Sequence, residues 1–281
     1  MTEELQKKVD RAIRLIQAGA KAAAQHGQPI EICYSGGKDS DVILELAKMS
    51  GVNYRAIYKN TTIDPPGTIK HVRERGVEVM QPKMSFRELL AKKGLPGRNR
   101  RFCCEHLKEY KILDYAVIGV RRDESDTRAT YEEPTVCMEY KKDVTAELYM
   151  PLLDFTAKDI EAFITERGIK CHPLYYDEQG RFHVERRLGC VGCPLAYRKH
   201  RIQEFKQMPG MVRLYVHAAQ KFLDAHPQSK MFAYLKDASD WFVMSLYCDS
   251  IADFKRKFGP TLLTPPIDCK AFLEETFGIK L

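Results

Sequence analysis

A phosphate-binding loop is indicated by six consecutive residues that combine glycine, hydroxyl, cationic and acidic groups. They are Ser35, Gly36, Gly37, Lys38, Asp39 and Ser40. Two adjacent glycines permit positive φ and let backbone N–H groups come close to a ligand. Lysine adds a positive charge, and the two serines add hydroxyl donors. The pattern is neither GxxxxGK[ST] nor GxGxxG, so it predicts a phosphate cradle of a different type.

The flanking residues predict the elements that position this loop. Residues 30–34 form a short apolar run, which is typical of a buried strand. After the loop, Val42, Ile43 and Leu46 recur at helical spacing. A helix N-terminus favours an anion, because its N–H groups and its dipole both attract negative charge. An ordinary glycine turn with an exposed lysine is the alternative interpretation.

Predicted strands and helices alternate along the chain, as in α/β proteins. Beyond 30–34, strands are predicted at 52–58, 77–82, 115–120 and 148–153, and helices at 3–26, 68–76, 86–92 and from 156. We therefore expect a mostly parallel, twisted sheet with helices on both faces. Ligands of such sheets bind at the carboxyl ends of the strands.

Polar loops follow two of these strands. Asn60 and Thr61 follow the strand at 52–58, where they either face a nucleotide or only belong to a turn that caps the next helix. Arg121, Arg122 and Arg128 follow the strand at 115–120, in a loop where an anionic ligand would sit.

The last third of the chain is mainly helical and rich in aromatic residues. Helices are predicted at 197–208, 210–226, 228–237 and 241–256, with a short helix at the end of the chain. Aromatic residues at helical spacing usually form a core. We therefore expect a nucleotide-binding α/β domain at 1–200 and a helical extension at 201–281.

Two cysteine pairs have spacings that suit a metal or cluster. Cys190 and Cys193 form a CxxC motif, and Cys103 and Cys104 are adjacent. Four thiolates are the ligands of a [4Fe–4S] cluster or of a tetrahedral zinc ion, although adjacent cysteines chelate zinc awkwardly. Buried thiols without metal, or a redox-active CxxC, are the alternatives. Nearby cations are expected to lower the thiol pKa values; they are Arg98, Arg100, Arg101, Arg186 and Arg187.

Composition sets broad limits on the function. The chain has 281 residues, nine cysteines and a net charge of +7, which suits a polyanionic ligand such as a nucleotide, tRNA or DNA. No apolar run approaches the roughly 20 residues of a membrane span, and the first residues do not resemble a signal peptide. We expect a cytoplasmic protein that does not bind membranes and whose cysteines do not form a disulfide framework.

These motifs together resemble the phosphoadenosine-phosphosulfate (PAPS) reductase family of the PP-loop ATP-pyrophosphatase superfamily, which has the adenine nucleotide alpha hydrolase-like fold. The resemblance covers about residues 30–200. The matching segments are SGGKDS at 35–40, the turn at 60–68, RFCC at 101–104, GVRRDES at 119–125 with Arg128, PLLDFT at 151–156 with Asp159, HPLY at 172–175 and GCVGCP at 189–194.

The resemblance implies roles for particular residues. It implies that Ser35 to Ser40 hold the phosphates of an adenine nucleotide, and that Arg121, Arg122 and Arg128 contact its phosphate or sulfate groups. The [4Fe–4S] cluster of the adenylyl-sulfate reductases in this family maps to Cys103, Cys104, Cys190 and Cys193. The family's C-terminal ECGxH segment, which carries the nucleophilic cysteine, is absent here; Cys248 and Cys269 lack its Gly and His.

This departure favours ATP chemistry over reduction of a sulfonucleotide. We expect cleavage of ATP at the α–β phosphate, giving AMP and pyrophosphate, for adenylation or sulfur transfer. Mg²⁺ would bridge the phosphates with Asp39 as its carboxylate ligand, and Lys38, Arg121 and Arg122 would stabilise the developing charge. The alternatives are reduction of PAPS or adenylyl sulfate, and a non-catalytic nucleotide sensor. The expected partners are an adenine nucleotide, a nucleic-acid or protein acceptor of sulfur or AMP, and a second copy of the chain in a dimer.

Overall fold

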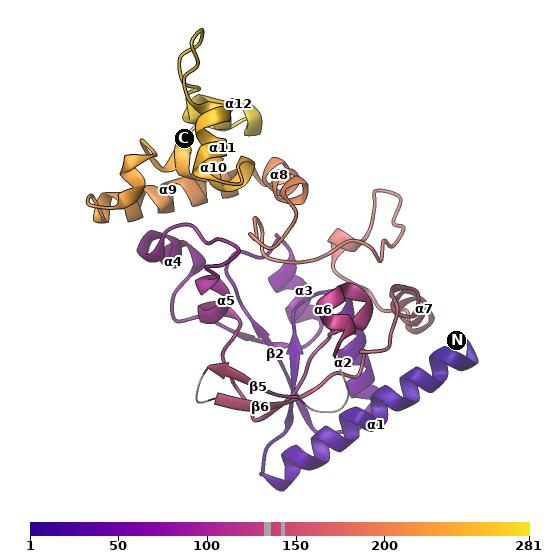
Figure 1. Cartoon of the computed structure of the whole chain (residues 1–281). Helices are drawn as coiled ribbons and strands as arrows, with labels where there is room; N and C mark the ends of the chain where they lie inside the picture. The colour runs from indigo at the N-terminus through magenta and orange to yellow at the C-terminus, as the bar shows by residue number, and fades with distance from the viewer. Residues whose placement is uncertain (132–135, 142–143) are drawn as a thin grey trace. The chain divides into compact units, whose positions relative to one another are not determined.

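The computed structural model describes residues 1–131, 136–141 and 144–281 and divides into two compact units. Unit 1 comprises Met1–Asn60, Asp64–Pro82 and Glu109–Gly189; unit 2 comprises Thr61–Ile63, Lys83–Lys108 and Cys190–Leu281. Each unit is therefore built from several separate stretches of the chain (Figure 1).

A six-stranded sheet forms the centre of unit 1 (Figure 1). Its order is β3 (Glu78–Met80), β2 (Tyr54–Lys59), β1 (Ile30–Tyr34), β4 (Tyr115–Val117), β6 (Val144–Tyr149), β5 (Val136–Lys141). Neighbouring strands pair in parallel from β3 to β6, and β5 pairs antiparallel with β6. The predicted α/β class with a mostly parallel sheet is confirmed. β5 was not predicted, and β6 begins and ends earlier than the predicted strand at 148–153.

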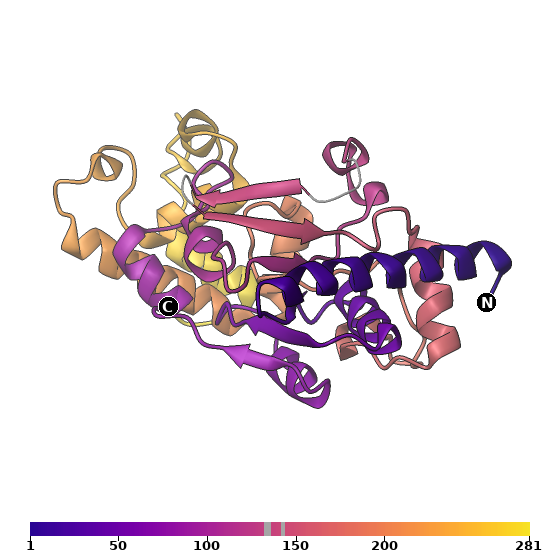
Figure 2. The ribbon, with the colours of Figure 1, turned by 90° about the horizontal axis from the view of Figure 1, so that it is seen from below.

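Apart from the short helix at 126–129, the helices of unit 1 bury apolar side chains in the same cores as the strands. They are α1 (Glu3–Gln25), α2 (Lys38–Ser50), α3 (Thr68–Glu74), α6 (Asp126–Ala129) and α7 (Ala157–Arg167), with 3₁₀ turns η1 (Arg122–Glu124) and η2 (Pro173–Tyr175). Figure 2 follows α1, the long indigo helix, which packs against α2 and β4. Gly19 is needed on its buried side, because a Cβ there would lie 2.6 Å from Cδ1 of Ile30 in β1.

Unit 2 is a helical body with one aromatic-rich core. Its helices are α4 (Phe86–Lys93), α5 (Phe102–Leu107), α8 (Arg198–Gln207), α9 (Pro209–Ala225), α10 (Ala238–Tyr247), α11 (Ile251–Phe258) and α12 (Cys269–Phe277), with a 3₁₀ turn η3 (Lys230–Ala233). Phe205 is fully buried and packs edge-on against Tyr215 and Phe242, with ring centroids 5.3 and 5.2 Å away. The predicted aromatic core is therefore present, although Tyr197 and Tyr234 lie outside it and are exposed.

Two predicted helices of this region differ from the structure. The segment 228–237 contains only the short turn η3, and the predicted helix at 241–256 is two helices, α10 and α11. The predicted helix is interrupted at Ser250, whose backbone is extended. The Ser250 hydroxyl accepts from the N–H of Asp253 at 3.1 Å and so caps the start of α11.

The predicted boundary at residue 200 also differs from the observed division. Unit 2 contains the expected segment 201–281, but it also takes 61–63, 83–108 and 190–200. The reason is packing: α4 lies against α9, and Leu89 and Leu90 share a core with Ala218 and Ala219. Among the described residues, no helix is long and apolar enough to cross a membrane.

Candidate nucleotide site and cysteine cavity

The loop between β1 and α2 has the strand–turn–helix geometry that its sequence predicts. Gly36 has φ +79°, which L side chains rarely adopt, and a Cβ there would lie 3.2 Å from atoms of Leu188 and Thr68. Gly37 is the N-cap of α2 and has no side chain to cap the helix. Because Gly36 and Gly37 have no side chains, the backbone of the loop lies directly against its neighbouring atoms.

The serines of the loop hold its shape. Ser40 Oγ donates to the carbonyl of Gly37 at 2.7 Å, and Ser35 Oγ donates to Ser40 Oγ at 3.2 Å. Ser40 is buried. These hydrogen bonds tie both ends of the loop together across the first turn of α2.

Three predicted catalytic side chains meet beside the loop. Lys38 Nζ lies 3.1 Å from Asp39 Oδ2, and Arg121 Nε lies 2.7 Å from Asp39 Oδ1. Lys38 and Arg121 are almost completely buried, at 4% and 5% exposure. Asp39 Oδ1 and Arg121 Nε are within ion-pair distance, yet their alignment does not meet hydrogen-bond geometry. The two side chains therefore interact as an ion pair and not through a hydrogen bond, because Coulomb attraction depends on distance far more than on angle.

The other predicted arginines have carboxylate partners of their own. Arg122 pairs with Asp154 and donates to the carbonyl of Tyr131 at 2.9 Å. Arg128 pairs with Glu124, which also accepts from Arg187 at 3.3 Å. The structure therefore brings Arg121 to the Lys38–Asp39 pair but directs Arg122 and Arg128 to other carboxylates.

The two polar residues after β2 belong to different units. Asn60 lies in unit 1, and its amide donates to Gln81 Oε1 at 2.8 Å. Thr61 lies in unit 2, is 1% exposed and lines the cysteine cavity described below. Their roles in nucleotide binding stay predictions.

Tyr175 is a loop-supporting residue that the sequence analysis did not single out. Its hydroxyl accepts from the backbone N–H of Lys38 at 3.2 Å and from that of Leu188 at 3.3 Å. Lys38 Nζ lies 5.5 Å from the centroid of its ring. Burial raises the pKa of the Tyr175 hydroxyl, so it stays protonated. The HPLY segment at 172–175 was the available signal for this residue.

A buried polar network lies under the first turn of α2. Asp41 is 0% exposed and accepts from Tyr34 Oη at 2.5 Å; His71 Nε2 and Arg75 Nε lie 3.1 and 3.2 Å from its carboxylate oxygens. Burial, and then the Asp41 charge, raise the pKa of Tyr34. The sequence analysis missed Asp41, because an aspartate in the first turn of a helix is also what a solvent-exposed helix would carry.

His172 is buried beside this network in its neutral form. Its Nδ1 accepts from the backbone N–H of Leu174 at 3.1 Å, so the proton is assigned to Nε2, which lies 3.4 Å from Thr68 Oγ1. Desolvation, and then the neighbouring His71, lower the pKa of His172 to about 4.

All four cysteines of the predicted cluster line one cavity in unit 2. Cys103 and Cys104 lie in α5, and Cys190 and Cys193 form a turn in which the Cys193 N–H donates to the Cys190 carbonyl at 3.2 Å. Gly192 has φ +73°, and its N–H donates to Glu204 Oε2 at 2.9 Å. The two pairs, about ninety residues apart in the chain, are thus brought together as the donor set predicts.

The cavity is small, and its thiols are not arranged as metal ligands. Its volume is about 20 Å³, close to the room that one water molecule needs. Within the part of the chain that the structure describes, no three His, Cys, Asp or Glu side chains are grouped as a metal site requires. The four thiols have the donor chemistry of a cluster, and the binding of a cluster stays a prediction.

The expected effect of nearby cations on these thiols is wrong for Cys103. A hydrogen bond with Cys104, then burial, then the charges of Cys104 and Cys190, raise the pKa of Cys103. Neighbouring thiols and desolvation therefore set the direction of the shift, and none of the five arginines is among its causes. The side chain of Cys137 lies outside the part of the chain whose side chains the structure describes.

A parallel sheet whose first strand leads through a glycine turn into a helix N-terminus, with a buried lysine there, is an arrangement with which α/β proteins bind phosphate groups. Comparison with known families then gives the particular family. The chain belongs to the phosphoadenosine phosphosulfate reductase domain family, whose model matches residues 29–196.

Similar proteins include one named enzyme and several uncharacterized proteins. An adenosine 5'-phosphosulfate reductase of Streptomyces coelicolor is 25% identical over 213 residues, which are 68% of this chain and 85% of that protein. An uncharacterized protein of Methanocaldococcus jannaschii is 27% identical over 237 residues, which are 78% of this chain. The chain spans only 54% of the length of that relative.

Solved structures with a related arrangement of elements have low identity. A PAPS reductase from Candida auris, in a phosphate complex, has a TM-score of 0.45 and 18% identity, covering 68% of this chain and 96% of its own. An FMN adenylyltransferase from Candida glabrata has a TM-score of 0.42 and 15% identity, covering 67% and 62%.

Proposed function

We propose that this protein binds ATP at the loop Ser35–Ser40 and cleaves it between the α and β phosphates. The observation that carries the proposal is the buried group of Lys38, Asp39 and Arg121 at the N-terminus of α2, directly after two glycines. Two cations and a helix N-terminus can stabilise the charge that develops on a leaving pyrophosphate.

The reaction assigns a distinct part to each group. A nucleophilic acceptor attacks the α-phosphorus, the bond to the bridging oxygen breaks, and pyrophosphate leaves with that electron pair. The acceptor is now adenylated, and a second nucleophile such as sulfide then attacks the acceptor and displaces AMP, which leaves with the electron pair of the broken bond. Lys38 and Arg121 hold the leaving oxygens, and Arg122 and Arg128 would exchange their carboxylate partners for phosphate oxygens. Mg²⁺ enters with ATP as part of the substrate. Asp39 suits it, because one carboxylate together with phosphate oxygens is a usual Mg²⁺ environment and its buried Oδ1 makes no hydrogen bond.

The test measures AMP and pyrophosphate formed from Mg²⁺-ATP, with sulfide and nucleic acid offered as acceptors. K38Q removes the central cation, and K48Q, an exposed lysine later in α2, is the matched control. We expect AMP and pyrophosphate in equal amounts from wild type and K48Q, and at least a hundredfold less from K38Q. ATP binding without any α–β cleavage by wild type would instead support a nucleotide sensor.

Reduction of PAPS or adenylyl sulfate is the second candidate, favoured by the family match. It needs a thiol nucleophile outside the cluster set. Cys269 is 3% exposed, and burial, then a hydrogen bond with Asp240, raise the pKa of its thiol, which opposes thiolate formation. Sulfite release from adenylyl sulfate by wild type that is lost in either C248S or C269S would favour reduction over ATP cleavage.

We also infer that Cys103, Cys104, Cys190 and Cys193 would hold a [4Fe–4S] cluster. Such a cluster would supply sulfide or shape the neighbouring surface. Anaerobic purification followed by iron and sulfide analysis tests this, and C104S compared with C248S separates a ligand from another cysteine of unit 2. We also propose that the acceptor of AMP or sulfur is a nucleic acid or a protein. The same proposal includes that the protein forms a dimer and is located in the cytoplasm.

A further inference from the structure

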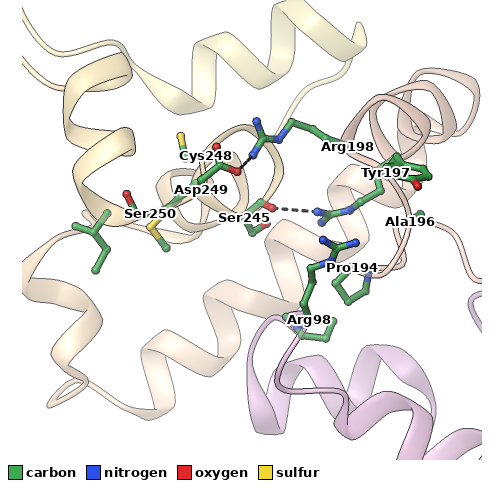
Figure 3. A pocket seen from close by; sticks show the side chains of 14 residues that line it. Arg98, Pro194, Ala196, Tyr197, Arg198, Ser245, Cys248, Asp249 and Ser250 are labelled. Atoms are coloured by element: carbon green, nitrogen blue, oxygen red, sulfur yellow. Dashed lines mark hydrogen bonds and ion pairs between the residues drawn. The ribbon is translucent and has the colours of Figure 1, made fainter. Parts of the chain in front are cut away.

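A second pocket, formed entirely by unit 2, is lined by three arginines (Figure 3). Its volume is about 640 Å³, within the range of small-ligand sites. Arg98 comes from the loop after α4, and Arg198 and Arg201 come from α8. Figure 3 shows Arg98 and Arg198 reaching toward the same hollow from different elements.

The arginines are only partly neutralised by their neighbours. Arg198 pairs with Asp249, the one carboxylate among the described residues that line the pocket. Arg98 donates to the carbonyl of Leu195 at 3.4 Å, and Arg201 donates to that of Ser245 at 3.0 Å. Three cations and one carboxylate leave the lining with two uncompensated positive charges.

Arg201 carries an orphaned donor. Its Nε is buried and makes no hydrogen bond with any described residue. Burial lowers the pKa of its guanidinium, which means that desolvation disfavours the charged form. An anion in the pocket would offset this cost and supply the missing acceptor.

An exposed aromatic ring stands at the same pocket. Tyr197, the N-cap residue of α8, is 79% exposed, which is unusual for a large apolar ring. Exposed cations follow both arginine-bearing segments in the chain, at Arg100 after Arg98 and at Lys199 after Arg198. A stacking surface beside a track of cations is the arrangement that binds single-stranded nucleic acid.

We propose that this pocket binds a single-stranded nucleic acid, with a backbone phosphate at Arg98 and Arg198 and one base stacked on Tyr197. A strand fits better than a free nucleotide, because the cations continue beyond the pocket. A single strand fits better than a duplex, because a concave pocket of this size admits one nucleotide, and only an unpaired base can stack on the exposed ring. The proposal does not depend on ATP cleavage.

The experiment measures fluorescence anisotropy of a labelled oligothymidine with the full chain, without ATP, over a series of salt concentrations. R98Q/R198Q removes two pocket cations, and R213Q/K221Q removes two exposed cations of α9 that do not line the pocket. We expect the plot of the logarithm of the association constant against the logarithm of salt concentration to become less steep by about 1.4 in the first double variant. In the second double variant its slope should stay unchanged.

Stacking is tested separately. Y197A should weaken binding roughly five- to hundredfold, Y197F should retain it, and Y234A, which removes another exposed tyrosine of unit 2, should have no effect. Undetectable binding, equal slopes in the two double variants, or equal affinity for the strand annealed to its complement would each overturn the proposal.

Discussion

The buried neutral His172 makes the stability of unit 1 depend on pH in a defined window. Its pKa falls from the ordinary value of 6.5 to about 4 in the folded protein, chiefly because of desolvation. Between these values the unfolded chain binds the proton and the folded chain does not. The free energy of unfolding therefore decreases as the pH falls from 6.5 towards 4.

The size of the effect follows from the two pKa values. A difference of about 2.5 between the pKa values of the unfolded and folded states corresponds to a loss of about 3 kcal/mol in the free energy of unfolding. No reduction for solvent screening is applied, because His172 is only 1% exposed. For a protein of this size that loss lowers the melting temperature by roughly 5 to 10 °C between pH 7 and pH 4. Other groups titrate in the same range, so the informative quantity is the difference between wild type and a variant.

H172Q removes this titration while keeping an acceptor for Leu174 and a donor near Thr68. We expect the melting temperature of H172Q, followed by circular dichroism, to change by 5 to 10 °C less than that of wild type over this pH range. H217Q, at an exposed histidine of α9, should follow wild type. If wild type and H172Q lose stability in parallel, the assignment of a neutral buried imidazole is refuted.

Two further substitutions test the supports of the candidate sites. Y175F removes the acceptor of two backbone N–H groups, one of them that of Lys38, and should lower the free energy of unfolding by about 1–3 kcal/mol and weaken ATP binding; unchanged urea denaturation would contradict this. G192A introduces a Cβ 2.3 Å from Cζ of Phe205 at φ +73°, and should cost about 2–5 kcal/mol. G189A, where no atom lies within 4 Å of the added Cβ, is its control, and equal melting temperatures would disprove the overlap.

Local sequence was sufficient to predict the strand–turn–helix geometry of the loop Ser35–Ser40. The apolar run before Ser35, the glycines and the helical spacing after Ser40 all lie within about twenty residues, so each requirement could be checked from its neighbours. The spacing of the cysteine pairs singled out four residues that line one cavity, whereas the cluster that they were expected to hold stays a prediction. The sheet followed from the alternation of strands and helices, except for β5, whose pairing with β6 depends on contacts along the edge of the sheet.

Properties set by tertiary packing were not predictable. Asn60 and Thr61 are neighbours in the chain, yet they belong to different units, because the chain passes from the sheet to the helical body between them. Asp41 has the sequence context of an exposed helix start, but Tyr34, His71 and Arg75 enclose it. Which side chains surround a charge depends on distant segments, and periodicity carries no information about that.

The partners of an arginine decide what it can attract, and only the structure supplies them. Arg122 and Arg128, the arginines expected to meet phosphate, already pair with carboxylates, so an incoming anion must displace a charge of its own sign. Arg98 and Arg201 were not selected as phosphate ligands, yet both donate to backbone carbonyls and neither has a carboxylate partner among the described residues that line the pocket. An anion gains most from cations that have no competing carboxylate. The affinity of the unit 2 pocket for nucleic acid should therefore fall more steeply with salt than the affinity of the nucleotide loop for ATP.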